Sequence, residues 1–278
     1  MEILLPILAA VGLLGGIGLV CGVVLAVAEK ACAVPVDEKR EALRGCLPGV
    51  NCGACGYTGC DGYAEALANG GSDAVNLCVP GGDDVSRAIA GVLGVEATDV
   101  VEHVAYVQCH GDCELATRKF EYEGIGSCAA ANMLYGGEWD CTYGCLGHGD
   151  CAKVCPTGAI CLENGIAHVD PRRCIGCGLC AKTCPKHIIT LFPDVKRVVV
   201  TCSSHDAGAA TRKKCKNGCI ACRKCEKSCP TGAVTVQDDL AVIDYDKCIN
   251  CGACADACPV HCIKYADFSG KHRQGDEG

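Results

Sequence analysis

The chain begins with one long apolar stretch, after which short apolar runs are interrupted by Gly, Pro and Cys. Residues 3–28 contain no charged side chain and consist mainly of Leu, Ile, Val, Ala and Gly. A helix of roughly 20 apolar residues can cross the hydrocarbon layer of a bilayer. The pattern therefore predicts a transmembrane helix over residues 1–28.

A cleaved signal peptide is the alternative interpretation, because residues 26–28 read Ala-Val-Ala. However, no basic residue precedes the apolar run, and the run is longer than the apolar region of a signal peptide. Basic residues follow it instead, at Lys30, Lys39 and Arg40. By the positive-inside rule, we expect a single-pass protein of the cell membrane with the bulk of the chain on the cytoplasmic side.

Cysteine dominates the chemistry of the sequence, with 30 of 278 residues, whereas aromatic residues make up only 4%. The cysteines recur as C-x-x-C runs followed by Pro, a pattern typical of metal thiolate ligands. Large side chains for a hydrophobic core are scarce, so we expect small units stabilised by metal centres. The net charge of −8 argues against nucleic acid as a partner.

Three runs have the spacing C-x2-C-x2-C-x3-C-P, which is typical of bacterial two-cluster ferredoxins. They begin at Cys174, Cys219 and Cys248. In such a pair, three cysteines of a run hold one [4Fe–4S] cluster and the fourth reaches the cluster of the partner run. The sequence therefore predicts iron–sulfur clusters rather than zinc.

A fourth, irregular run begins at Cys141 and ends at Cys155. A shift of 74 residues places eight cysteines between 141 and 184 onto cysteines between 215 and 258, which predicts a duplicated two-cluster unit. The eight are Cys141, Cys145, Cys151, Cys155, Cys174, Cys177, Cys180 and Cys184. The one mismatch is His148, which stands opposite Cys222. We expect Cys141 to replace the missing ligand and His148 to be a loop residue.

An earlier motif reads Cys52-Gly-Ala-Cys55-Gly-Tyr-Thr-Gly-Cys60, and Cys78 follows at a distance. The spacing suits four thiolates around one cluster, and the glycines let the backbone turn tightly around the sulfurs. Zinc is the alternative here, because four thiolates also hold Zn²⁺.

Together the motifs predict five [4Fe–4S] clusters with twenty cysteine ligands. The five sets are Cys52, Cys55, Cys60 and Cys78; Cys141, Cys145, Cys151 and Cys184; Cys155, Cys174, Cys177 and Cys180; Cys219, Cys222, Cys225 and Cys258; and Cys229, Cys248, Cys251 and Cys254. A sixth cluster near Cys109, Cys113 and Cys128 is the alternative to treating these three as structural thiols. Its fourth ligand would be Cys46, Cys202 or Cys215.

These motifs divide the chain into parts with a predicted α+β fold. The parts are a transmembrane anchor (1–28), a small helical 4Fe-4S unit (29–95), a connecting segment with a Val-rich strand (96–135), two ferredoxin-like units (136–193 and 194–270) and an acidic tail (271–278). The sequence holds no dinucleotide-binding glycine motif, no P-loop and no nucleophile paired with a base. We therefore expect no catalytic residue on this chain, and an electron carrier whose redox chemistry belongs to its clusters.

The order of these parts resembles the B subunit of the Rnf complexes, which are membrane-bound, Na⁺- or H⁺-translocating ferredoxin:NAD oxidoreductases. The resemblance rests on the apolar N-terminal helix, the Cys-Gly-x-Cys-Gly-Tyr-x-Gly-Cys motif and the tandem ferredoxin runs, and is to the long form with two ferredoxin pairs. It implies a translocase subunit without a complete active site. Such a subunit accepts electrons from reduced soluble ferredoxin and passes them to the other membrane and peripheral subunits, which carry the flavins.

Two other functions fit parts of the sequence. One is a polyferredoxin-type subunit of a different membrane oxidoreductase. The other is a cluster-assembly protein or redox sensor, which the apolar N-terminal segment and the lack of an output domain disfavour. Residues 212–227 hold seven basic residues and one acidic residue. They predict a docking site for soluble ferredoxin, and the alternative is that they offset the negative charge of the neighbouring cluster or form a solvated face.

Overall fold

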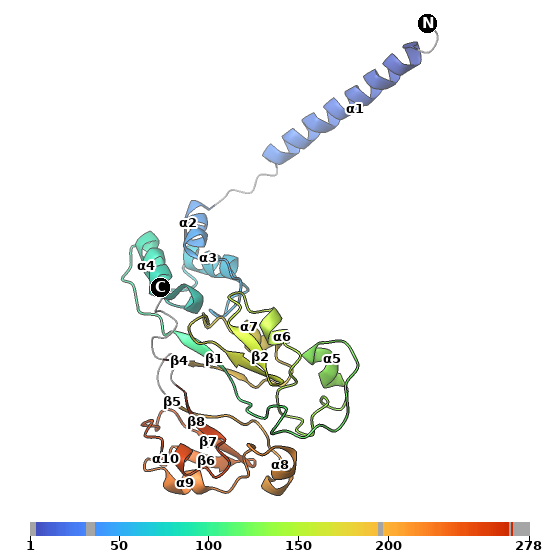
Figure 1. Cartoon of the computed structure of the whole chain (residues 1–278). Helices are drawn as coiled ribbons and strands as arrows, with labels where there is room; N and C mark the ends of the chain where they lie inside the picture. The colour runs from blue at the N-terminus through green and yellow to red at the C-terminus, as the bar shows by residue number, and fades with distance from the viewer. Residues whose placement is uncertain (1–3, 32–36, 194–196, 267, 269–278) are drawn as a thin grey trace, which may run out of the picture.

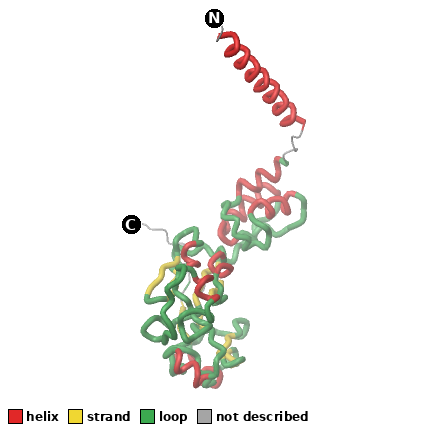
Figure 2. The backbone as a smooth tube through the Cα atoms, turned by 90° about the vertical axis from the view of Figure 1, so that its right-hand side faces the viewer, coloured by secondary structure: helices red, strands yellow, loops and turns green. Residues whose placement is uncertain are grey.

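The computed structural model describes residues 4–31, 37–193, 197–266 and 268 (Figure 1). The helix α1 (Leu4–Ala31) has 28 residues and projects away from the other elements in Figures 1 and 2. Its side chains between residues 12 and 28 are all exposed. Among the described residues, no helix has both the length and the apolarity of a membrane span. The expected helix is present, but the prediction that it crosses a membrane is not confirmed.

A small helical unit follows α1. It consists of α2 (Glu38–Cys46), α3 (Cys60–Ala68), the 3₁₀ turn η1 (Val79–Gly81) and α4 (Gly82–Leu93). The Asp37 carboxylate begins α2 by accepting a hydrogen bond from the Lys39 N–H at 3.0 Å. The helices pack around the fully buried side chains of Leu43, Tyr63 and Ile89.

Two further units each contain two antiparallel two-stranded sheets and two short helices. The first pairs β1 (His103–Val107) with β4 (Ile189–Pro193) and β2 (Ile160–Glu163) with β3 (Ile166–Val169), and contains α6 (Asp150–Lys153) and α7 (Leu179–Thr183). The second pairs β5 (Arg197–Val200) with β8 (Ile263–Ala266) and β6 (Val234–Gln237) with β7 (Leu240–Ile243), and contains α9 (Lys224–Ser228) and α10 (Ala253–Asp256). The remaining helices are α5 (Cys128–Met133) and α8 (Gly208–Lys214).

The 74-residue repeat of the sequence is also a repeat of the structure. A shift of 74 places β2 and β3 onto β6 and β7 residue for residue. β1 and β5 are equivalent too, because Val107 pairs with Ile189 as Val200 pairs with Ile263. β1, which falls in the predicted connecting segment, thus completes the first ferredoxin-like unit. The loop that follows β1 is much longer than the loop that follows β5, so the 74-residue spacing of the repeat does not extend to β1.

The two ferredoxin-like units share an apolar core where β1–β4 meets β5–β8. Val104 and Phe192 of the first unit are buried together with Val199 and Ala266 of the second. A polar contact reinforces this joint, because the Ser203 hydroxyl donates to the Gln108 carbonyl at 3.0 Å. The repeats therefore pack as one body, with equivalent edges facing each other.

Candidate metal centres

No disulfide joins the cysteines in the described part of the chain. Within the same ranges, no three His, Cys, Asp or Glu side chains converge closely enough to hold a single metal ion. The thiols gather in sets of four around small cavities or loops.

The first set lies in the helical unit. One cavity is lined by all four predicted ligands, Cys52, Cys55, Cys60 and Cys78. The Asn51 side chain holds the loop in place, because its carbonyl oxygen accepts a hydrogen bond from the Cys60 N–H at 2.9 Å. Burial, together with the charge of the Cys60 thiolate, raises the pKa of Cys78 to about 11. A cationic iron centre would offset the cost of keeping these buried sulfurs ionised.

The second set consists of Cys155 and the first three cysteines of the run that begins at Cys174. Burial raises the pKa of Cys180 to about 12, and the thiolates of Cys174, Cys177 and Cys155 add to the rise. This set lies beside the first one. The Cys52 thiolate contributes to the burial-raised pKa of Cys177. The Lys182 ammonium of α7 also donates to the Cys52 carbonyl at 2.7 Å, which fixes the helical unit against the first ferredoxin-like unit.

The third set differs from the sequence prediction at one position. A cavity beside β4 is lined by Cys128, Cys145, Cys151 and Cys184, whereas Cys141 does not line it. Burial raises the pKa of Cys151 to about 12, with contributions from the Cys145 and Cys128 thiolates. Cys128, at the start of α5, therefore takes the position that the sequence assigned to Cys141.

Asp150, the first residue of α6, places Cys128 at this cavity. Its carboxylate accepts hydrogen bonds from the Ser127 hydroxyl at 2.8 Å and from the Ala129 N–H at 3.0 Å. Burial alone would raise the pKa of Asp150, but these bonds and Lys153 lower it. The long loop after β1 is thus tied to the cluster-binding run. His148 contacts the Glu138 carboxylate at 3.4 Å, as a half-buried loop residue.

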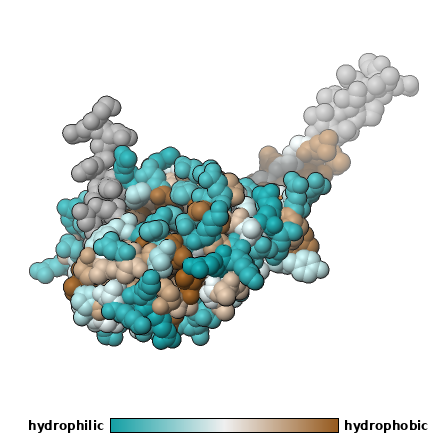
Figure 3. All heavy atoms as spheres, turned by 60° about the horizontal axis from the view of Figure 1, so that its bottom comes forward, coloured by the Kyte–Doolittle hydropathy of each residue, from teal (hydrophilic) through white to brown (hydrophobic). Residues whose placement is uncertain are grey.

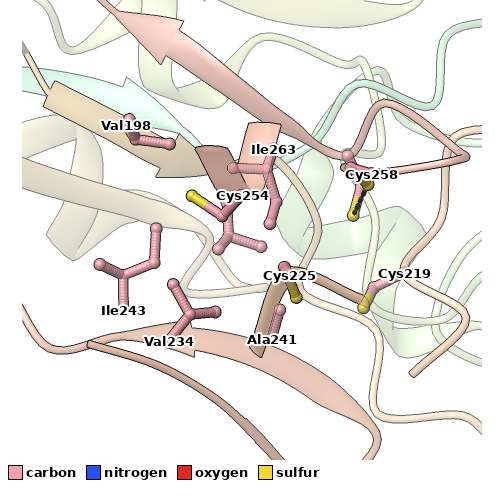
Figure 4. Packing of buried hydrophobic residues seen from close by; sticks show 11 residues of the cluster. Val198, Cys219, Cys225, Val234, Ala241, Ile243, Cys254, Cys258 and Ile263 are labelled. Carbon is pink, nitrogen blue, oxygen red and sulfur yellow. Dashed lines mark hydrogen bonds between the residues drawn. The ribbon is translucent and has the colours of Figure 1, made fainter. Parts of the chain in front are cut away.

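The second ferredoxin-like unit holds the last two sets. One cavity is lined by Cys219, Cys222, Cys225 and Cys258, and Figure 4 shows three of these side chains on one side of the buried core. Cys254 lies among the apolar side chains of the same core, and burial raises its pKa, with contributions from the thiolates of Cys248 and Cys229. Cys251, the remaining predicted member of that set, is exposed.

Cys262 is an additional residue that lines the cavity of the Cys219 set. It is 2% exposed, and its Sγ lies 3.6 Å from Cys258 Sγ. A hydrogen bond from the Cys262 thiol lowers the pKa of Cys258 to about 5, despite burial. Only the tertiary structure shows this contact, because Cys262 lies outside the repeated spacing.

Backbone geometry around the sets suits cluster sulfurs. The N–H groups of Ala159 and Ala233 donate to Cys155 Sγ and Cys229 Sγ, each at 3.3 Å. Ala105 N–H donates to Cys174 Sγ at 3.5 Å. Hydrogen bonds of this kind stabilise negative sulfur and are among the features that set cluster potentials. The residues present therefore fit [4Fe–4S] centres.

Comparison with known proteins agrees with this chemistry. Residues 47–80 match the family described as "Putative Fe-S cluster". Residues 173–233 and 218–262 match the family described as "4Fe-4S dicluster domain". The first dicluster match spans both ferredoxin-like units, because it pairs the two regular runs. The structure instead pairs each run with its neighbour within one unit.

The relatives extend over most of the chain. The B subunit of the Na(+)-translocating ferredoxin:NAD(+) oxidoreductase complex of Acetobacterium woodii is 45% identical over 92% of this chain and 77% of that protein. The chain belongs to the family of Rnf B subunits. The B subunit of the proton-translocating complex of Clostridium ljungdahlii is 48% identical over 84% of this chain and 82% of its own length. The B subunit of the ion-translocating oxidoreductase complex of Methanosarcina acetivorans is 39% identical over 86% of this chain and 90% of its own length.

Membership of the Rnf B-subunit family, with the dicluster domains, defines the chain as an iron–sulfur electron-transfer subunit of an ion-translocating oxidoreductase. Its fold combines iron–sulfur domains with mixed helices and strands. The resemblance seen in the sequence is thus confirmed.

Replacing Cys128 by Ala should remove about four irons per chain after anaerobic reconstitution, because a [4Fe–4S] set loses one of its four thiolates. Cys113→Ala is the matched control, since Cys113 lies on the same long loop and is exposed. Iron and acid-labile sulfide analysis measures both variants. An unchanged iron content in Cys128→Ala would contradict the placement of Cys128 in this set.

Replacing Cys262 by Ala should make the midpoint potential of the Cys219 set more negative by roughly 40 mV. Loss of a hydrogen bond worth about 1 kcal/mol destabilises the more negative, reduced state by that amount. A redox titration followed by electron paramagnetic resonance measures the shift. Cys161→Ala, at an exposed cysteine, should leave every potential in place. A positive shift in Cys262→Ala would show that its thiol does not act as a donor.

Proposed function

We propose that this chain accepts electrons from reduced ferredoxin and relays them to the other subunits of an Rnf complex. The observation that carries the proposal is the series of five thiol sets within one chain of the Rnf B-subunit family. The sets are Cys52, Cys55, Cys60 and Cys78; Cys155, Cys174, Cys177 and Cys180; Cys128, Cys145, Cys151 and Cys184; Cys219, Cys222, Cys225 and Cys258; and Cys229, Cys248, Cys251 and Cys254. A [4Fe–4S] cluster bound by such a set takes up and releases one electron at a time.

The chain itself would fix the positions of these sets relative to one another and provide the environment of their sulfurs. Lys182 ties the first set to the second, and the shared apolar core holds the two ferredoxin-like units together. Buried thiols and backbone N–H donors would exclude water from the sulfurs and set their potentials. The chemistry at NAD and the translocation of Na⁺ or H⁺ would belong to partner subunits.

The apolar helix α1 would anchor the chain in the cell membrane. Support comes from the absence of charge over residues 3–28 and from exposed side chains such as Leu13, Leu19 and Leu25, each at least 67% exposed. Such a row of exposed apolar side chains would be covered by lipid or by a partner helix. The basic residues that follow favour the cytoplasmic side for the remaining chain.

The basic segment 212–227 is the proposed docking surface for ferredoxin. Figure 3 brings the end of the molecule that carries α8 and α9 in Figure 1 forward, and hydrophilic residues there lie among hydrophobic ones. Arg212, Lys213 and Lys216 are exposed, whereas Lys214 is paired with Asp206 at 2.7 Å. The exposed ligand Cys222 is followed directly by the exposed Arg223 and Lys224. Positive charge beside an accessible cluster site would attract an acidic carrier protein.

Changing Arg212, Lys213 and Lys216 to Gln should lower the second-order rate of reduction by ferredoxin roughly tenfold at low ionic strength. It should also flatten the fall of the rate with added salt, because fewer charges remain to be screened. Stopped-flow absorbance measures the rate. The control variant Lys39→Gln/Arg40→Gln/Arg172→Gln removes the same number of positive charges at three other exposed positions. It should be reduced by ferredoxin at the wild-type rate. If wild type is not reduced by ferredoxin at all, the proposed function is wrong.

Removing residues 1–28 should move the chain from the membrane fraction to the soluble fraction, because the apolar segment is lost. Its iron content should stay the same, since every cysteine of the five sets lies downstream. Fractionation and iron analysis of the chain produced without its partner subunits test this. A truncated chain that stays in the membrane fraction would indicate a second membrane contact.

A further inference from the structure

A cavity at the joint between the two ferredoxin-like units is lined by cysteines that the five sets leave unused. Two of them, Cys109 and Cys202, follow the equivalent strands β1 and β5. The other two, Cys141 and Cys215, are related by the 74-residue repeat. Each unit thus contributes one strand-end cysteine and one loop cysteine.

The repeat gives this cavity an approximate twofold symmetry. The Cys145 N–H donates to Cys109 Sγ at 3.3 Å, and the Cys219 N–H donates to Cys202 Sγ at the same distance. Cys145 and Cys219 are themselves equivalent in the repeat. Both strand-end sulfurs therefore accept the type of backbone hydrogen bond seen at the sulfurs of the other sets.

Cys141 lies among the other three thiols. It interacts electrostatically with Cys109, Cys202 and Cys215. A side chain added at Gly144 would begin 3.5 Å from Cys109 Sγ and 3.7 Å from Cys141 Sγ. One added at Gly111 would begin 2.9 Å from Cys215 Sγ. The two glycines keep the space around the sulfurs free of other side chains.

Two unpartnered polar atoms line the same cavity. Trp139 Nε1 and His110 Nδ1 are buried, and neither has a hydrogen-bond partner in the described part of the protein. The indole N–H of Trp139 is always a donor, and a buried donor without an acceptor is costly, which points to an acceptor that occupies the cavity. The sulfides and thiolates of an iron–sulfur cluster accept such hydrogen bonds.

We propose that Cys109, Cys141, Cys202 and Cys215 bind a sixth [4Fe–4S] cluster, with two ligands from each ferredoxin-like unit. The choice of a cluster over a single metal ion rests on the proposed function. Four thiolates in a buried cavity require a cationic centre to offset their charge.

The location links the two units. Cys145, which donates to Cys109, belongs to the third set, and Cys219, which donates to Cys202, belongs to a set of the second unit. The sixth site therefore lies between the Cys145 set of the first unit and the Cys219 set of the second. Direct pairing across the joint closes its rim, because Thr117 N–H donates to the Lys214 carbonyl and Lys216 N–H to the Leu115 carbonyl, each at 2.9 Å.

Iron, zinc and acid-labile sulfide counts on the anaerobically reconstituted full chain test the proposal. We expect about 24 irons per chain in wild type, four for each of six sites. Cys202→Ala should contain about 20 irons and lose one spin system in the reduced electron paramagnetic resonance spectrum. The double variant Cys141→Ala/Cys202→Ala should also contain about 20, because both residues serve one cluster. Cys161→Ala is the control and should contain about 24.

Three results would overturn the proposal. They are about 20 irons in wild type, a loss of eight irons in the double variant, and a loss of one zinc without iron in Cys202→Ala. If the variants fail to fold and lose all iron, the wild-type count decides between five sites and six. A wild type with about 24 irons that ferredoxin does not reduce would reject the proposed function and leave the sixth site in place.

Discussion

The main physical constraint on this structure is the cost of burying thiolates close to one another. The units that bury them are small and contain few large apolar side chains. Burial raises the pKa of Cys78, Cys151 and Cys180 to about 11 or 12, so these sulfurs would be protonated without a cation beside them. Binding of iron and folding of the unit are therefore linked processes. This explains why small side chains and short strands are sufficient here, and why so few aromatic residues are needed.

Backbone hydrogen bonds complete the surroundings of the sulfurs. At Cys155 and Cys229 the donor is the alanine N–H four residues later, a contact that the Pro-Thr-Gly-Ala turn produces locally. At Cys109 and Cys202 the donor instead belongs to another loop, so that contact forms only when strand and loop are packed together. Local turns thus build the ferredoxin sets, whereas the joint between the units builds the cavity at Cys109.

The first ferredoxin-like unit differs from the second mainly by one insertion. The loop between β1 and the first run carries α5, and Asp150 holds the start of that helix so that Cys128 reaches the Cys145 set. The ligand missing at His148 is thereby replaced from outside the repeat. Because Cys128 fills this position, Cys141 is left to the joint, where its repeat partner Cys215 also lies. The run at Cys141 is therefore irregular, and the first dicluster match, residues 173–233, begins only at the regular run that follows it.

The sequence alone predicted the chemistry, the duplication and the ligand sets, because C-x2-C-x2-C-x3-C-P spacing places sulfurs through short local turns. It also predicted the apolar N-terminal helix from the composition of residues 3–28. Only the tertiary structure placed Cys128 rather than Cys141 at the Cys145 cavity, added β1 to the first unit and placed Cys141 at the joint with Cys109 and Cys202. These contacts join residues that are far apart in the chain, through strand pairing and a carboxylate that binds a distant helix. Such contacts follow no fixed spacing, so no periodicity in the sequence could record them.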